Sequence, residues 1–352
     1  MLKMNLNNNH PLLSIVIPVF NHPDLVKVMI DSILANEFTD WELLVVDDGS
    51  DASTLSFLNN LTLSDTRICL LQRSELPKGA PTCRNIGMNA AHGNYIVFFD
   101  SDDYVTPQCL GQRVQAITQH PEFDFMVFPS GLYIDHKFVP DANEYVYGYP
   151  IYTDDLKAFA KRLLPFIGWS CIYRLSSLRS HGIRWDTQLR SLQDADFNVR
   201  VLLAGLKYDY AHCPPDYGYR INGNTQSISK KIVTEEHFRS NFYAIERYYQ
   251  LFQSAFGNQY NRALYNGVLY IYRSVFENGL SPDFARQIAD IVKQYSPGYG
   301  RLLQVQVESS LFLRRFLSEK LARQIPIIPY LIRFRYHLKC FLPCKLRKYK
   351  NS

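Results

Sequence analysis

The sequence predicts an α/β fold with a doubly wound, mostly parallel sheet, followed by a helical region. Continuous apolar runs rich in β-branched residues recur along the first hundred residues, and they indicate strands buried on both faces. These runs occupy residues 12–19, 43–46 and 95–99, and a further strand is expected over 67–71. Segments with helical spacing separate them, and the short connections imply right-handed crossovers with helices on both faces of the sheet.

The elements follow one another in this alternating order. Helical spacing follows the first strand over residues 25–33, and a shorter helix is expected over 55–61. A loop rich in Gly and Pro then leads into a helix that contains Arg84, and Gly93 ends this helix. Beyond the fourth strand we expect a helix over 107–119, a strand over 123–128 and loops over 133–150.

Composition places the chain among globular proteins. It has 352 residues, of which 47% are hydrophobic and 20% charged, enough for one large domain or two ordinary ones. The seven cysteines are scattered and include no Cys-x-x-Cys, which favours a reducing compartment without a disulfide framework or zinc site. We expect no signal peptide, because the N-terminus lacks a charged-then-apolar segment with a small-residue cleavage site. We expect no spanning helix, because no run of about 18 apolar residues occurs.

Charge is divided unevenly along the chain. Residues 311–352 contain eleven Lys or Arg and one Glu, a net charge of +10, whereas the remainder carries −5. The last segment also contains many Ile, Leu, Phe and Tyr residues. Basic and bulky apolar residues together suit an anionic membrane surface, although a solvated basic tail has the same composition. A nucleic-acid partner is disfavoured because no recognised binding motif is present.

Three carboxylates within four positions, Asp100, Asp102 and Asp103, follow the strand over 95–99. Such closely spaced charges need a cation or hydrogen-bond donors, and an oxygen-only ligand set favours Mg²⁺ or Mn²⁺. A solvated acidic turn is the alternative. Neither a Gly-x-Gly-x-x-Gly turn nor a P-loop pattern follows the first strand, so any nucleotide is bound in another way.

A series of short motifs then makes the prediction specific. In order they are Pro18-Val19-Phe20-Asn21, Val46-Asp47-Asp48-Gly49-Ser50, Arg84-Asn85-x-Gly87, Ala91-x-Gly93-x-Tyr95 and Phe99-Asp100-Ser101-Asp102-Asp103. Together they resemble the GT-A nucleotide-sugar domain of family 2 glycosyltransferases over roughly residues 12–230. The resulting prediction is a GT-A catalytic domain over 1–230, a helical C-terminal region over 231–323 and a basic amphipathic tail over 324–352.

The resemblance implies a donor site made of Pro18, Phe20, Asn21, Asp48, Arg84, Asp100 and Ser101. Asp48 would accept a hydrogen bond from the nucleotide base, although it could instead cap a helix. Arg84 would face the donor phosphates, with a surface salt bridge as the alternative. Asp102 would be the principal ligand of a Mn²⁺ or Mg²⁺ cofactor.

On the acceptor side, Trp169 and the segment around Gln193 and Asp194 resemble family motifs. The resemblance makes Asp194 the general base, with Gln193 in place of a common Glu. The alternative is that these acids only begin a helix. Asn222 stands where relatives often have a metal-contacting His, which puts that contact in doubt, and His212 is expected to be structural.

The expected function is an inverting, metal-dependent transfer of one sugar from a nucleotide-diphosphate sugar, most simply a UDP-sugar. The acceptor would be a hydroxyl of a glycan or lipid-linked glycan in bacterial capsule, O-antigen lipopolysaccharide or similar surface polymers. Processive synthases carry Gln-x-x-Arg-Trp, but His181 precedes Arg184-Trp185 here. The predicted location is cytoplasmic and peripheral on the inner membrane face. The alternatives are a catalytically silent sugar-nucleotide-binding protein and a nucleotidyltransferase, which would usually show a Gly-rich basic loop after the first strand.

Overall fold

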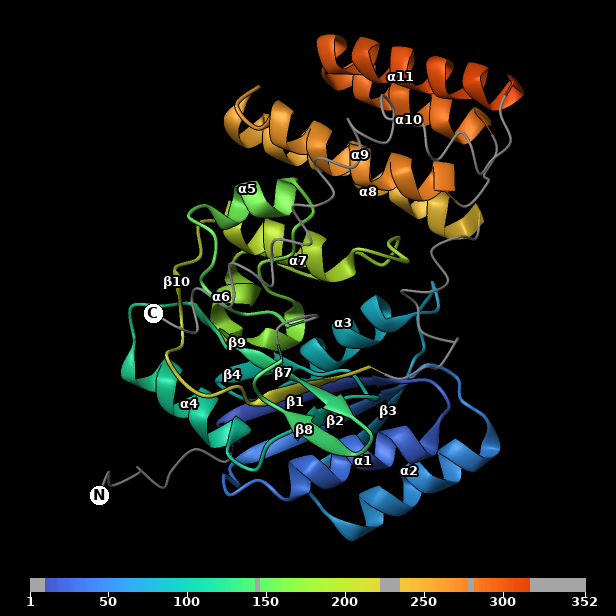
Figure 1. Cartoon of the computed structure of the whole chain (residues 1–352). Coiled ribbons are helices and arrows are strands. Elements are labelled where there is room, and N and C mark those ends of the chain that lie inside the picture. The colour runs from blue at the N-terminus through green and yellow to red at the C-terminus, as the bar shows by residue number, and fades with distance from the viewer. Residues whose placement is uncertain (1–9, 143–145, 222–234, 278–281, 317–352) are drawn as a thin grey trace. The chain divides into compact units, whose positions relative to one another are not determined.

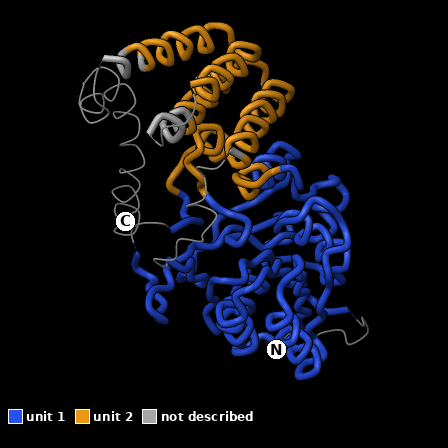
Figure 2. Tube along the Cα trace, turned by 90° about the vertical axis from the view of Figure 1, so that its right-hand side faces the viewer, with its two compact units in different colours: residues 1–150, 166–188, 197–223 blue, residues 151–165, 189–196, 224–352 orange. Residues whose placement is uncertain are grey.

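The computed structural model describes residues 10–142, 146–221, 235–277 and 282–316, and it divides into two compact units (Figures 1 and 2). Unit 1 comprises residues 1–150, 166–188 and 197–223, and unit 2 comprises 151–165, 189–196 and 224–352. Segments 151–165 and 189–196, which precede residue 230, therefore group with the C-terminal helices. The predicted tail over 324–352 lies outside the described residues.

A seven-stranded sheet forms the centre of unit 1, in the order β10-β6-β9-β4-β1-β2-β3. Its strands are β1 (Leu13–Val19), β2 (Trp41–Asp47), β3 (Ile68–Gln72), β4 (Tyr95–Phe98), β6 (Phe125–Val127), β9 (Cys171–Arg174) and β10 (Tyr208–Tyr210). The first four strands are parallel, as predicted, whereas β9 runs antiparallel to both β4 and β6. The fold thus has the predicted α/β class. The sheet is mixed, and it is parallel over the half that carries the acidic motifs.

Helices cover both faces of this sheet (Figure 1). They are α1 (Pro23–Leu34), α2 (Ala52–Ser64), α3 (Ala80–Ala90), α4 (Cys109–Gln119) and α6 (Leu175–Ser180). Ile15 and Ile17 of β1 share one buried core with Met29 of α1 and Leu110 of α4. The intervening Val16 faces α3, where a Cβ at Gly87 would lie 2.4 Å from the valine side chain. Glycine at this position therefore permits the close packing of α3 on the sheet.

A second, four-stranded sheet in unit 1 has the order β5-β11-β7-β8. Its strands are β5 (Tyr104–Val105), β7 (Ser130–Ile134), β8 (Lys137–Val139) and β11 (Tyr217–Arg220). The prediction of loops over 133–150 is therefore wrong at its start, where β7 and β8 form a hairpin. Its turn residues Asp135 and His136 have φ angles of 48° and 61°, the left-handed conformation of two-residue hairpin turns.

Unit 2 is helical. It contains α5 (Asp155–Ala160), the first turn of α7 (Gln193–Leu203), and α8 (Glu235–Phe256), α9 (Asn261–Glu277), α10 (Pro282–Tyr295) and α11 (Pro297–Phe316). The predicted helical C-terminal region is confirmed, and in α8 the residues Ile245, Tyr249 and Phe252 are buried at spacings of three and four residues. Among the described residues, no helix is both long enough and apolar enough to cross a bilayer.

Candidate active site

The acidic turn, defined as Asp100–Asp103, leaves the carboxyl end of β4 and leads directly into β5. The backbone N–H of Asp103 donates to the carbonyl oxygen of Asp100 at 3.4 Å, which closes the turn. Strand β1 lies next to β4, and β2 lies next to β1. These three parallel strands end at the same edge of the sheet. The carboxylates therefore lie where ligands bind doubly wound sheets.

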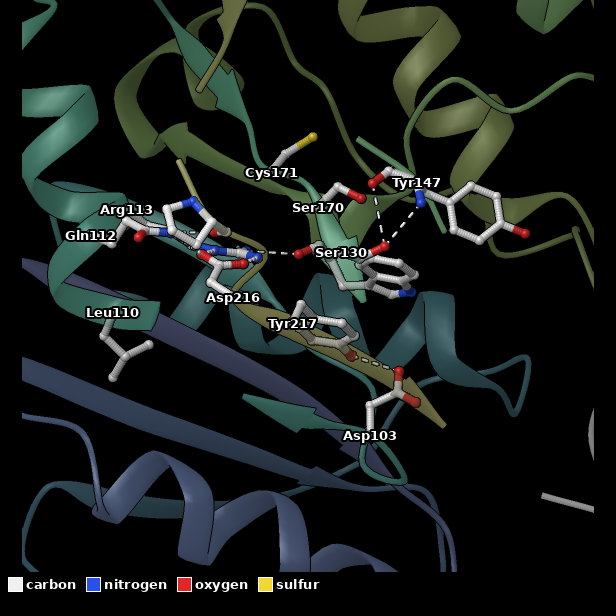
Figure 3. Close-up of polar contacts among 12 residues, drawn as sticks. Asp103, Leu110, Gln112, Arg113, Ser130, Tyr147, Ser170, Cys171, Asp216 and Tyr217 are labelled. Carbon is white, nitrogen blue, oxygen red and sulfur yellow. Dashed lines mark hydrogen bonds and ion pairs between the residues drawn. The ribbon is translucent and has the colours of Figure 1, made fainter. Parts of the chain in front are cut away.

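Asp103 is bound within the protein. Its side chain is buried and accepts a hydrogen bond from the Tyr217 hydroxyl at 2.7 Å (Figure 3). It also accepts one from the Arg220 backbone N–H at 2.7 Å. Burial, and then the charges of Asp102 and Asp100, raise the pKa of Asp103 well above its ordinary value. Both carboxylate oxygens are thus occupied by fixed donors, and the residue holds the turn.

Asp100 is also partly occupied. Its Oδ1 accepts a hydrogen bond from Arg84 at 2.6 Å, while its side chain remains 33% exposed. The Arg84 guanidinium lies 4.4 Å from the centre of the Trp185 ring and is almost fully buried. The alternative of a surface salt bridge is therefore only half right: Arg84 forms an ion pair, but on the buried side of the turn.

Asp102 differs from both neighbours because its side chain is exposed and, within the described residues, its carboxylate accepts a hydrogen bond only from its own backbone N–H. The Arg220 guanidinium reaches the backbone carbonyl of Asp102 instead. Nearby protein reduces hydration of the carboxylate, and this desolvation, followed by the Asp100 charge, raises the pKa of Asp102. Ser101 lies beside it and is half-buried.

The donor set of the turn fits a hard divalent cation bound through few protein ligands. Within the described residues, no three His, Cys, Asp or Glu side chains are arranged as a metal site. Mg²⁺ and similar ions usually keep water molecules and bind one or two carboxylates together with substrate phosphates. One uncommitted carboxylate, Asp102, beside a partly exposed Asp100 suits that mode and does not suit an all-protein cage.

The predicted nucleoside side lies after β1. Phe20 is 47% exposed, and Lys78 Nζ lies 3.4 Å from the centre of its ring, a cation–π contact at the surface. Asn21 has a φ of 56°. Its N–H donates to the Ser50 hydroxyl, and its side-chain oxygen accepts from the Asp51 N–H, each at 2.9 Å. Asn21 therefore joins the loops after β1 and β2.

Asp48 lies in the loop after β2, which hydrogen-bonds back to β1. One carboxylate oxygen accepts from Arg73 at 2.5 Å and from the Gly79 N–H at 3.2 Å. The alternative role as a helix cap is wrong, because Asp51 is the N-cap of α2. Burial and the Asp48 charge raise the pKa of Cys83 to about 12, so this thiol is not a nucleophile at neutral pH. Pro18 pairs in register with Val46 at the same edge of the sheet.

Trp169 lies in the short 3₁₀ helix η1 (Gly168–Ser170) and is buried. Its ring stacks on Tyr217 with centroids 4.4 Å apart, and on Tyr219 at 6.0 Å. Tyr147 meets it edge-on at 5.7 Å. The acceptor-side role of Trp169 stays a prediction. Because the Trp169 ring is buried, it would contribute to an acceptor site by supporting Tyr147 and Tyr219.

Gln193 and Asp194 begin α7 in unit 2. The Gln193 amide donates to the carbonyl oxygens of Leu189 and Arg190, which anchors the helix start. Asp194 is half-exposed, whereas Asp196 is buried and pairs with Arg247 at 2.7 Å. Asp196 therefore fits the alternative prediction, in which an acid at the start of the helix has a structural role. Because Asp194 and Asp102 belong to different units, their convergence in one site stays a prediction.

Sequence reasoning missed the residues that support the acidic turn. Tyr217 was not singled out, nor was the buried pair formed by Arg113 and Asp216, whose bonds measure 2.7 and 2.8 Å (Figure 3). A buried strand that ends in Tyr and Arg and is preceded by Asp was the available signal. Asn222, in the place of a possible third metal contact, lies outside the described residues, and His212 is exposed on the chain between β10 and β11.

Comparison with known proteins agrees with this geometry. The model of "Glycosyl transferase family 2" matches residues 14–182. The uncharacterized glycosyltransferase EpsJ of Bacillus subtilis is 28% identical over 257 residues, covering 68% of this chain and 70% of EpsJ. The Escherichia coli UDP-Glc:alpha-D-GlcNAc-diphosphoundecaprenol beta-1,3-glucosyltransferase WfgD is 41% identical over 92 residues, covering 26% of this chain and 35% of WfgD.

Among solved structures, Staphylococcus aureus TarS residues 1–349 in complex with UDP-GlcNAc has a TM-score of 0.64 at 16% identity, covering 86% of this chain and 91% of that one. The fold is therefore the GT-A fold, and the chain is a glycosyltransferase with a family 2 domain over residues 14–182. The predictions of family, fold class and enzyme class are confirmed.

Proposed function

We propose that this glycosyltransferase moves one sugar from a UDP-sugar to a hydroxyl group of a glycan or lipid-linked glycan, with inversion, in the synthesis of a bacterial surface polymer. The observation that carries the proposal is the acidic turn at the end of β4, in which Asp103 is occupied and Asp102 remains available. Homologues whose names specify surface polymers or lipid-linked GlcNAc support the acceptor class. A TarS complex with UDP-GlcNAc supports a UDP-linked donor.

In this proposal the donor diphosphate lies beside the acidic turn. Arg84, which is paired with Asp100, supplies a fixed positive charge next to the diphosphate. Phe20 and Asn21 border the base, and Asp48, oriented by Arg73, accepts the imide N–H of uracil. When bound at Asp102, a divalent cation stabilises negative charge on the leaving diphosphate, a use of metals common among GT-A enzymes.

Asp194 is proposed as the general base. It would accept the proton of the acceptor hydroxyl while the oxygen attacks the anomeric carbon from the face opposite the diphosphate. Attack from that face forms the new glycosidic bond as the bond to the diphosphate breaks, which inverts the anomeric configuration. A carboxylate in the first turn of a helix is stabilised as an anion, and this keeps Asp194 ready to accept a proton.

A thermal-shift panel tests the donor proposal. The full-length protein is heated with UDP-glucose, UDP-GlcNAc, UDP-galactose and GDP-mannose, each with and without MnCl₂. We expect one UDP-sugar to raise the melting temperature and MnCl₂ to increase that rise, because ligands that bind the folded state stabilise it. A panel without any nucleotide-dependent shift would contradict the proposal.

We also propose that the basic tail binds the anionic inner face of the cytoplasmic membrane. The support is the net charge of +10 over residues 311–352 together with their bulky apolar residues. Each basic residue near such a surface contributes about 1 kcal/mol. Deletion of residues 325–352 should move the protein from the membrane pellet to the supernatant, and an unchanged distribution would rule the tail out as the anchor.

A further inference from the structure

Strand β11 holds the acidic turn at all three of its carboxylate-bearing residues. The Tyr217 hydroxyl donates to Oδ2 of Asp103 at 2.7 Å (Figure 3). The same hydroxyl accepts from the backbone N–H of Asp100 at 3.2 Å. The Arg220 backbone N–H donates to Oδ1 of Asp103, and its guanidinium donates to the carbonyl oxygen of Asp102. These bonds fix the backbone on both sides of Asp102 and leave its carboxylate unbound.

Tyr217 is itself held in place from several directions. It is fully buried, and its backbone pairs with β5 on one side and β7 on the other. Trp169 stacks on its ring at an interplanar angle of 7°. The adjacent Asp216 binds Arg113 through both oxygens, and Arg113 also donates to the Trp169 carbonyl oxygen at 2.7 Å. Tyr217 therefore has the rigid support that a residue needs to fix the position of another group.

The bonds from β11 also decide which carboxylate is available. Three carboxylates within four residues repel one another, and an unsupported turn would relax by separating them. Tyr217 and Arg220 occupy both oxygens of Asp103, and Arg84 occupies one oxygen of Asp100. The negative charge left for a ligand is thus concentrated on Asp102.

We propose that Tyr217 is a positioning residue, which with Arg220 sets the shape of the acidic turn so that Asp102 meets the metal–diphosphate group of the donor. This inference rests on the proposed function. It adds a requirement that no sequence motif contains, namely a tyrosine hydroxyl from a strand 114 residues after Asp103.

The test compares Tyr217→Phe with Tyr173→Phe. Tyr173 is also fully buried, and its hydroxyl donates to Asn198 at 2.8 Å, so the control loses a similar hydrogen bond elsewhere in unit 1. Affinity for UDP is measured by titration calorimetry with and without MnCl₂, and Mn²⁺ binding is measured separately by the electron paramagnetic resonance signal of free Mn²⁺. Arg220→Gln is the second test variant, because it removes the guanidinium bond to Asp102 and keeps the backbone bond to Asp103.

We expect Tyr217→Phe to weaken Mn²⁺-dependent UDP binding about tenfold, with a smaller loss in Arg220→Gln, because hydrogen bonds to charged groups contribute in this range. Tyr173→Phe should lower the melting temperature and keep the affinity. Wild-type affinity in folded Tyr217→Phe, or in Arg220→Gln if Tyr217→Phe does not fold, would overturn the inference alone. Absence of Mn²⁺-dependent UDP binding in the unsubstituted protein would overturn the proposed function as well.

Discussion

Arg113 and Arg84 each pair with an aspartate in unit 1, and the two pairs differ in how much of their charge the protein satisfies. Arg113 donates to both oxygens of Asp216, and the two side chains are 0% and 2% exposed. Arg84 donates to Oδ1 of Asp100, whose side chain is 33% exposed. The first pair supports the fold, and the second leaves negative charge at a sheet edge where a cation and a phosphate can complete it.

A related contrast between a buried and a half-exposed carboxylate occurs at the start of α7, and it gives the largest predicted effect. Asp196 is buried against Arg247, whereas Asp194 is half-exposed. Asp194→Asn should reduce the rate of UDP release from the bound donor about 10²- to 10⁴-fold at unchanged donor affinity, because it removes the proposed general base. Initial rates measure the effect.

Asp196→Asn is the matched control for Asp194→Asn. It should lower the unfolding temperature through loss of the buried pair with Arg247 and retain more of the activity. If Asp194→Asn transferred sugar at the wild-type rate, Asp194 would not be the base.

The closed pair of unit 1 gives the next largest effect. Arg113→Met leaves Asp216 buried without its partner, which should cost about 3–5 kcal/mol of unfolding free energy in urea titrations. Adding Asp216→Leu should recover part of this loss, since the uncompensated charge is then removed. Unchanged stability in the single variant would show that the pair does not support the fold.

The open pair should respond differently to the same substitution. Arg84→Met keeps an apolar side chain against Trp185 and removes the charge beside Asp100. We expect a roughly tenfold loss of UDP affinity by calorimetry with an unfolding free energy that changes by no more than about 1 kcal/mol. The comparison fails if Arg84→Met destabilises the protein as strongly as Arg113→Met.

The smallest predicted effect concerns the stability contribution of Asp102. Desolvation and the charge of Asp100 raise the pKa of Asp102 above its ordinary 3.8, so ionisation of Asp102 disfavours the folded state. Asp102→Asn removes this cost and should stabilise the protein at pH 7 by roughly a few tenths of a kcal/mol, because solvent screens an exposed carboxylate.

This stability gain from Asp102→Asn should grow as pH rises from 3.8 to the raised pKa of Asp102 and then stay constant. It should vanish below pH 3.8, where Asp102 is protonated in both the folded and the unfolded protein. Urea titrations at several pH values measure it, with Ser101→Ala as a neighbouring control. A destabilised Asp102→Asn at pH 7 would show that the carboxylate has a structural partner.

Local pattern was enough to predict the strands of the parallel half and the acidic turn after β4. The apolar run over 95–99 corresponds to β4, and the run over 12–19 corresponds to β1. Each prediction depended on consecutive residues, because burial on both faces requires a continuous apolar strand. The β7–β8 hairpin was missed because the left-handed conformation of Asp135 and His136 carries little sequence signal outside glycine and asparagine.

The sequence alone determined the family, the α/β fold class and the set of acids from which the proposed site is built, since these depend on short motifs and on the periodicity of apolar residues. Only the tertiary structure decided the state of each acid: Asp103 is bound by Tyr217, Asp48 by Arg73, and Asp102 has an available carboxylate. Hydrogen bonds and burial set these states, and both depend on partners brought together by sheet pairing across many tens of residues.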